Sequence, residues 1–175
     1  MYKSGKTASW LALPLLALLL GACNDQYVHV GECWAALDKL PPPANALKLE
    51  VKGPTSGAVG DKVQFTVTPQ DNGYLWLVQI DSADQVQLLF PNEEKFDNRV
   101  EAGREYVFPG TLDKPTGVHL LAFVVTSHAE GLEKVLPAPV RDALPINTEQ
   151  RVQPMGVTLD QGLRWGWRKQ VLNVQ

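Results

Sequence analysis

The spacing of hydrophobic positions changes at three consecutive prolines, residues 41–43. Before them, the stretch GECWAALDKL (residues 31–40) has its apolar side chains at helical spacing, at Cys33, Trp34, Leu37 and Leu40. The prolines end this pattern because each lacks the N–H that a helix requires and holds the preceding residue in extended geometry. The pattern predicts a short helix or turn over residues 31–40 that packs on the domain following it.

Beyond the prolines, apolar and polar residues alternate. The stretches ALKLEVK (residues 46–52) and KVQFTVT (residues 62–68) each place every second side chain, all apolar, on one face. This spacing of two predicts strands with one buried and one solvated face. Residues 53–61 (GPTSGAVGD) supply the turn between them.

The central part of the chain predicts more deeply buried strands. Residues 74–81 begin with apolar residues on both faces, which is typical of a strand in the middle of a sheet. A tight connection at 81–84 and a second arm at 85–90 then indicate a hairpin, and the apolar run 118–125 indicates a buried strand. The fold class we expect is mainly β: an antiparallel β-sandwich of immunoglobulin-like or transthyretin-like type, over residues 46–175, with a short N-terminal helix.

Residues 1–22 have a different pattern. Lys3 and Lys6 form a positive head, and an uncharged apolar run extends from Trp10 to Leu20. This is the profile of a signal peptide. A permanent membrane span requires about 20 apolar residues, and this run has 11.

The end of this apolar run and the three residues after it resemble a known processing site. The sequence LGAC, ending at Cys23, resembles the lipobox of bacterial lipoproteins. The resemblance implies cleavage before Cys23, a diacylglyceryl group on its thiol and firm membrane anchoring by two or more acyl chains. The alternative is a conventional secreted protein with a cysteine near the cut. We therefore expect a signal peptide at 1–22, a lipidated tether and short helix at 23–45, and the sandwich domain at 46–175.

The residue after the lipidation site bears on which membrane is used. Asn24 favours the outer membrane, with the protein facing the periplasm, because an aspartate at that position would signal retention in the inner membrane. Sorting rules differ among bacteria, so the inner membrane stays open as an alternative.

The net charge limits the classes of partner that the protein is expected to bind. Cleavage after residue 22 would remove Lys3 and Lys6, leaving 14 basic against 19 acidic residues and a formal charge of −5. This acidic balance, without a basic cluster, argues against nucleic acid as a partner. It also gives no attraction to anionic lipid, so we expect membrane contact through the N-terminal lipid alone and another envelope protein as the partner.

Lipidation of Cys23 leaves the second cysteine without a disulfide partner, because a thioether sulfur cannot form one. Cys33 is then an odd cysteine in an oxidising compartment. Two interpretations remain: it packs with Trp34 and Leu37 against the domain, or it is exposed and joins two copies.

The middle of the chain resembles a second family. The elements are GYLWLVQID, LLFPN, Asn98, Ala102-Gly103, Pro109 and PTGVHLLAFVVTS. In this order they resemble the bacterial domain of unknown function 4384 from about Leu47 to Ser127. That family occurs in envelope lipoproteins and appended to caspase-like peptidases or Ser/Thr kinases. The resemblance implies an accessory β domain and assigns no catalytic residue.

Candidate chemistry is sparse. His29, His119 and His128 are too scattered for a metal cluster, and no phosphate-binding or nucleophile motif is present. Asp81 and Asp84 are interpreted as turn residues, with a calcium site as the alternative. We expect neither an enzyme, nor a metal, nor a cofactor.

The C-terminal third supplies the candidate binding residues. Pro137, Pro139 and Pro145 predict an extended, irregular linker, followed by LRWGWRKQVLNV at the end of the chain. In a strand, Trp165 and Trp167 share one face, and Arg164, Gly166 and Arg168 share the other. Either the tryptophans close the sandwich, or they form with the arginines an exposed surface that binds a partner.

The function we expect is a lipid-anchored, periplasm-facing module that binds or scaffolds another envelope protein. A type VI secretion system is one setting, by analogy from location and family context. An alternative is an immunity protein or inhibitor whose acidic surface blocks a periplasmic toxin or hydrolase. A small-ligand carrier or an enzyme would need a deep polar pocket, and no feature of the sequence indicates one.

Overall fold

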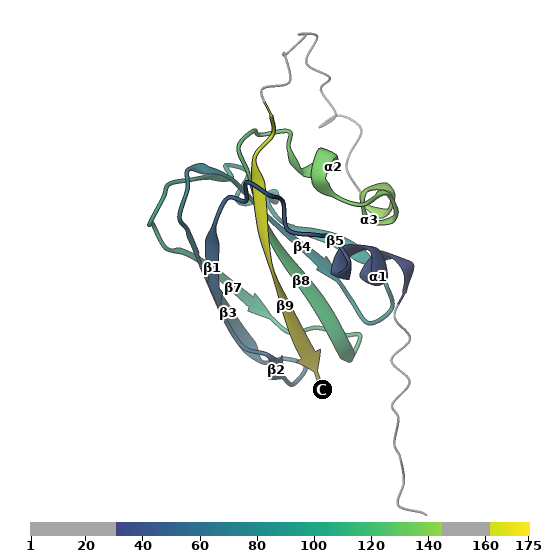
Figure 1. The fold of residues 1–175 in the computed structure, drawn as a ribbon. Coiled ribbons are helices and arrows are strands. Elements are labelled where there is room, and N and C mark those ends of the chain that lie inside the picture. The colour runs from purple at the N-terminus through teal and green to yellow at the C-terminus, as the bar shows by residue number, and fades with distance from the viewer. Residues whose placement is uncertain (1–30, 145–161) are drawn as a thin grey trace, which may run out of the picture.

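The computed structural model describes residues 31–144 and 162–175. Two β-sheets pack face to face, and three short helices cover the outer face of the larger sheet (Figure 1). The elements are α1 Glu32–Asp38, β1 Leu49–Lys52, β2 Ser56–Gly57, β3 Lys62–Pro69, β4 Gly73–Ile80, β5 Val86–Phe90, β6 Arg99–Val100, β7 Tyr106–Thr111, β8 Gly117–Thr126, α2 Leu132–Val135, α3 Ala138–Ala143 and β9 Trp165–Val174.

The expected sandwich is confirmed. The small sheet has the order β1-β3-β7, and the large sheet has the order β2-β9-β8-β4-β5, with β6 beside β4. The predicted β4–β5 hairpin is present, and the two strands predicted at 46–52 and 62–68 pair antiparallel as β1 and β3. One pair departs from the expected pattern, because the two-residue strand β2 runs parallel to the end of β9.

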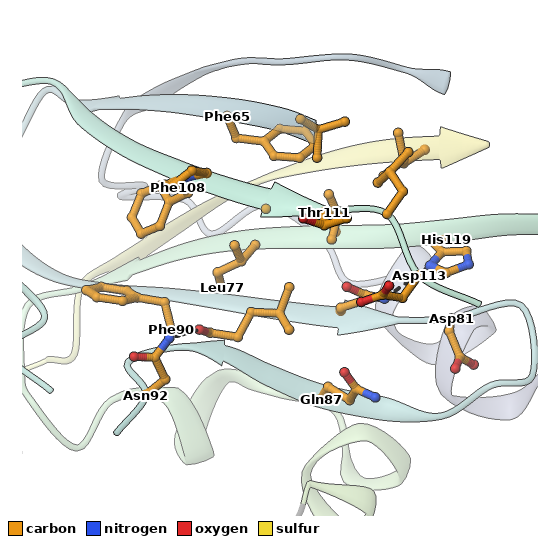
Figure 2. A pocket seen from close by; sticks show the side chains of 18 of the residues that line it. Phe65, Leu77, Asp81, Gln87, Phe90, Asn92, Phe108, Thr111, Asp113 and His119 are labelled. Atoms are coloured by element: carbon orange, nitrogen blue, oxygen red, sulfur yellow. Dashed lines mark hydrogen bonds between the residues drawn. The ribbon is translucent and has the colours of Figure 1, made fainter. Parts of the chain in front are cut away.

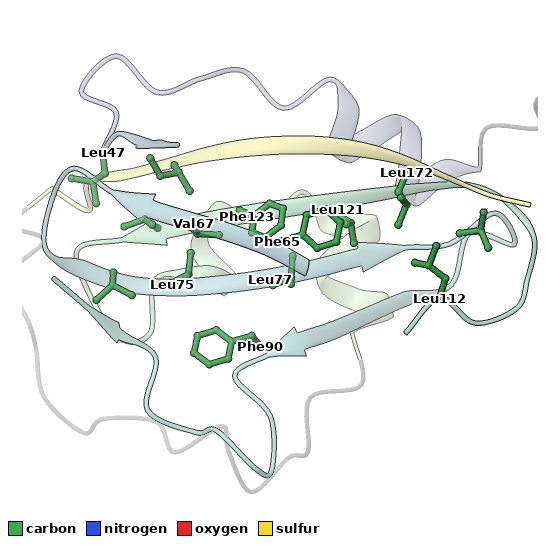
Figure 3. Packing of buried hydrophobic residues seen from close by; sticks show 14 residues of the cluster. Leu47, Phe65, Val67, Leu75, Leu77, Phe90, Leu112, Leu121, Phe123 and Leu172 are labelled. Atoms are coloured by element: carbon green, nitrogen blue, oxygen red, sulfur yellow. The ribbon is translucent and has the colours of Figure 1, made fainter. Parts of the chain in front are cut away.

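Strand β8 divides the interior into two apolar clusters. It lies between β4 and β9, and its side chains alternate between the two faces of the large sheet. Leu121, Phe123 and Val125 point toward the small sheet and form the core between the sheets (Figure 3). Leu120, Ala122 and Val124 point the other way and pack against the helices. Burial on both faces explains the continuous apolar run of this strand.

The helical layer corrects one expectation. Residues 137–144 do not form the irregular linker that their prolines suggested, because α3 begins immediately after Pro137. Pro137 is the capping residue and Pro139 lies in the first turn, where no partner is available for a backbone N–H and proline is tolerated. Pro145 lies outside the described residues. Val140 is fully buried against the large sheet.

Helix α1 confirms the short helix predicted over residues 31–40, and it packs beside α3. Leu37 is fully buried, and Cys33 is 9% exposed with its thiol directed at the Pro139 carbonyl, 3.5 Å away. The buried interpretation of Cys33 is therefore confirmed. Within the described residues, no helix combines the length and the hydropathy that crossing a membrane requires.

Candidate functional site

The two long sides of the sandwich differ. On one side, β9 of the large sheet is joined to the segment around β1 and β2. The Leu47 N–H donates to the Trp165 carbonyl at 3.0 Å, and the Gln170 side chain donates to the Pro54 carbonyl at 3.1 Å. A Cβ at Gly166 would overlap the Leu47 carbonyl oxygen, so the two backbones touch there. This side is closed.

The opposite side is open. Strands β5 and β7 are the outer strands of their sheets there, and they do not pair with each other. Between them lies a cleft of about 480 Å³, which we call the β5–β7 cleft. Figure 2 shows Phe65, Phe108 and Thr111 on one side of it and Leu77, Phe90 and Gln87 on the other. A volume of this size lies within the usual range for binding sites.

The floor of the cleft is the core itself. Leu77 and Leu121 from the large sheet and Phe65 from the small sheet belong to the cluster between the sheets and also line the cleft. Phe90 and Phe108 meet edge to face across the gap, with ring centroids 5.1 Å apart. They also line a second, shallower hollow that continues along β7 past Tyr106. The cleft thus reaches the core: Phe65, Leu77 and Leu121 are 3–6% exposed, and Tyr106 and Phe108 on β7 are half-buried.

One end of the cleft is polar and well ordered. His119 is 4% exposed, and its Nδ1 lies 3.1 Å from the Gln79 amide nitrogen. Its Nε2 lies 2.8 Å from the Pro115 carbonyl oxygen. The arrangement fits a ring with its proton on Nε2, donating to Pro115 and accepting from Gln79. Both ring nitrogens are occupied, so His119 holds the turn before β8 rather than presenting a free base.

The mouth of the cleft carries charges of both signs. Glu94 and Lys95 stand at one end, and Asp113 and Lys114 at the other. In the described part of the chain, none of these four side chains has an ion pair or hydrogen bond. Each therefore remains available to a bound molecule.

The LFPN element shapes one end of this mouth. The Asn92 side-chain amide donates to the Leu89 carbonyl at 3.0 Å, and its oxygen accepts from the N–H groups of Glu94 and Lys95. Asn92 thus ends β5 and folds the charged loop beside the cleft.

The predicted aromatic and basic residues are only partly brought together. Trp165 and Trp167 share one face as expected, but that face is the helix-covered one, so they do not lie between the sheets. Both are half-buried. Arg164 is exposed and 3.6 Å from Asp71, and Arg168 is exposed on the opposite face of β9. Cys23 lies outside the described residues.

The two turn aspartates have structural roles. Asp81 Oδ1 accepts from the N–H groups of Ala83 and Gln85 and so forms the β4–β5 turn. Asp84 accepts from the N–H groups of Cys33 and Trp34, at 3.0 and 2.9 Å, and caps α1. Asp81 Oδ1 and both carboxylate oxygens of Asp84 therefore accept hydrogen bonds within the protein.

No metal centre is formed within residues 31–144 and 162–175, where no group of three His, Cys, Asp or Glu side chains is arranged to hold an ion. His119 is used as described above. His128 contributes its carbonyl, which accepts from the Thr126 hydroxyl at 2.7 Å, and His29 lies outside the described residues.

The fold and the cleft define a β-sandwich module with one open side and a helical outer layer. Residues 56–136 match the family described as domain of unknown function (DUF4384). This range overlaps the resemblance found in the sequence and supports the domain prediction. It runs from β2 to α2 and holds most of the cleft, but it excludes β1 and β9, which complete the two sheets. No curated protein and no solved structure matches the chain.

The cleft was not predicted from the sequence. One signal was present: Pro109 stands within an alternating stretch, YVFPGT, and proline inside a strand indicates an edge position. That β5 would be the facing edge depends on how the two sheets pack, and local spacing does not report this.

Proposed function

We propose that this protein is a lipid-anchored binding module of the bacterial envelope, attached through Cys23 and facing the periplasm, which engages another envelope protein. The LGAC sequence behind a short apolar run supports the anchor. The acidic charge supports a protein partner over nucleic acid or a lipid surface. An accessory role in a type VI secretion system is one setting for such a module.

The attachment of α1 supports this arrangement by restricting the domain. Seven residues lie between Cys23 and Gly31, so the tether spans at most about 28 Å. Gly31 lies against Asp84, in the β4–β5 turn. The end of the sandwich that carries this turn would therefore face the membrane. The start of β9, with Trp165, would point away from it, because Thr126 at the far end of β8 pairs with Trp165.

The single observation that carries the binding role is the β5–β7 cleft. It combines a floor of core side chains with four charged side chains at its mouth that have no partner in the described chain. Apolar surface with a polar, charged rim is typical of protein interaction sites. The buried imidazole of His119 is occupied at both nitrogens, so it serves the structure of the cleft.

Affinity purification of the detergent-solubilised, lipidated protein after chemical crosslinking in cells tests this function. The proposal predicts specific co-purification of one or more envelope proteins, lost or reduced in a Cys23→Ser variant that cannot be anchored. Recovery of a single toxin or hydrolase would favour the immunity or inhibitor alternative. Absence of any specific crosslinked protein would contradict a binding role.

A further inference from the structure

We propose that the β5–β7 cleft receives an extended peptide segment of the partner protein, which adds as a strand to the free edge of β7 and places apolar side chains on the cleft floor. This inference rests on the proposed binding function and names the chemistry that the site recognises. Strand addition to an exposed sheet edge is an established mode of peptide recognition.

The free edge of β7 offers backbone groups to such a strand. In an antiparallel pair, alternate residues direct both N–H and C=O toward the partner strand. The Leu112 N–H donates to Asp61, on the β3 side. By alternation, the backbone N–H and C=O groups of Val107, Pro109 and Thr111 are directed toward the cleft. Proline suits this edge because it has no N–H that would be left unpaired. Val107 and Thr111 are exposed and supply two donors, and all three residues supply carbonyls.

The facing edge, β5, offers fewer groups. The Gln85 carbonyl accepts a hydrogen bond from the Asp81 N–H. The backbone N–H and C=O groups of Gln85 and Gln87 are therefore directed toward β4, and those of Val86 and Leu88 are directed away from it. The Leu89 carbonyl is already used by Asn92. We therefore assign backbone pairing to β7, with β5 forming the opposite wall of the cleft.

The chemistry of the cleft matches a peptide more closely than a purely apolar ligand. Its floor of Phe65, Leu77 and Leu121 suits apolar side chains, and its wall carries the exposed amide of Gln87, which can pair with a peptide group. The charges at the mouth alternate in sign at both ends. They complement a segment in which acidic and basic residues flank apolar ones.

The closed side of the sandwich gives an internal comparison. There, the edge of β9 is completed by β2, with the Asn173 N–H donating to Thr55 at 2.9 Å and the Gln175 N–H donating to Gly57 at 2.9 Å. A short extended segment of the chain thus satisfies one outer edge of this fold. No described segment does the same for β7.

The test uses the mature chain with Cys23→Ser, immobilised and panned against a phage library of random linear dodecapeptides. We expect enriched peptides with alternating apolar and polar residues, and at least a tenfold loss of their binding to Gln87→Trp, which fills the cleft from an exposed position. The matched control is Val171→Trp, an exposed position on β9 outside the cleft, which should bind as the parent does. N-methylation of alternate peptide nitrogens should abolish binding, because it removes the donors to β7.

Three results would overturn the inference: no enrichment, equal binding to Gln87→Trp, or full tolerance of N-methylation. A dimer in solution that Gln87→Trp dissociates would assign the cleft to a second copy, which also overturns it. The proposed function is judged separately by crosslinked purification of the anchored protein. If Gln87→Trp still captures the same envelope protein, the binding function stands and the cleft is not its site.

Discussion

The carboxylate of Asp84 accepts a hydrogen bond from the backbone N–H of Cys33 at 3.0 Å. The two residues are 51 positions apart, and the bond joins the β4–β5 turn to the first turn of α1. Asp84 also accepts from the Trp34 N–H, and Gly31 leaves room for it because a Cβ there would overlap the carboxylate. The helix that follows the proposed anchor is thereby attached to the sandwich at a defined point.

Removing this cap should loosen α1 without unfolding the sandwich. Asp84 has φ +62°, a conformation that glycine adopts readily, so Asp84→Gly keeps the left-handed backbone and removes the capping carboxylate. We expect a loss of about 1 kcal/mol in the free energy of unfolding, with faster amide hydrogen exchange in residues 33–38 and unchanged exchange in β8. Asp84→Asn retains one acceptor and tolerates this φ. Its stability and its exchange rate in α1 should lie between those of the parent and of Asp84→Gly. Unchanged exchange in α1 for Asp84→Gly would contradict the capping role.

Gly166 should be intolerant of any side chain. It stands between two tryptophans in β9, and a Cβ would overlap the backbone of Leu47 on the closed side of the sandwich. Because backbone must move to admit it, Gly166→Ala should cost roughly 3 kcal/mol in urea denaturation. Gly162→Ala is the control, since nothing lies within 4 Å of its Cβ position. Equal stability of the two variants would refute the close approach.

The thiol of Cys33 should be unreactive in the folded protein. Burial, and secondly the carboxylate of Asp84, raise the pKa of this thiol above its usual value. With Cys23→Ser as the parent chain, so that Cys33 is its one thiol, a maleimide should therefore label the native parent as poorly as the same chain with Cys33→Ser added, and label the parent fully only in urea. Rapid labelling of the native parent would show that the thiol is exposed.

The same pKa shift predicts a dependence of stability on pH. A thiol whose pKa is higher in the folded than in the unfolded chain contributes stability below the unfolded pKa, about 8.5, and loses it as the pH rises toward the folded value. The stability advantage of the parent over Cys33→Ala should thus shrink between pH 7.5 and pH 10. A constant difference in urea midpoint across this range would argue against the shift.

Lipidation can be tested within the chain itself, because it has two cysteines. Metabolic labelling with a palmitate analogue should mark the wild type and Cys33→Ser and should leave Cys23→Ser unmarked. The reason is that the proposed lipobox, LGAC, contains Cys23 and not Cys33. Label retained on Cys23→Ser would rule out the lipoprotein assignment.

The sequence predicted the parts of the fold that local spacing determines. Alternation predicted strands β1 and β3, the tight connection at 81–84 predicted the β4–β5 hairpin, and the apolar run of β8 indicated a buried strand. The helix α3 was missed because its prolines were read as breakers, although Pro137 and Pro139 occupy the positions where a helix accepts them. Strand β2, with two residues, is too short to produce a pattern.

The candidate site was less accessible to sequence reasoning. Spacing showed correctly that Trp165 and Trp167 share a face, but not that this face meets the helical layer instead of the small sheet. The cleft arises because β5 and β7, which are about twenty residues apart in the chain, end different sheets on the same side. Such a relationship is set by sheet packing, which depends on contacts between distant segments.

Site-specific photocrosslinking in living cells is the most direct test of whether the β5–β7 cleft binds a segment of an envelope protein. A benzophenone amino acid would replace Gln87 in the cleft or, as a control of similar exposure, Val171 on β9, in the lipidated full-length protein. We expect position 87 to give a discrete adduct with an envelope protein, mapping to one continuous segment of that protein. Position 171 should give none. Adducts of equal yield at both positions, or none at position 87, would contradict this expectation.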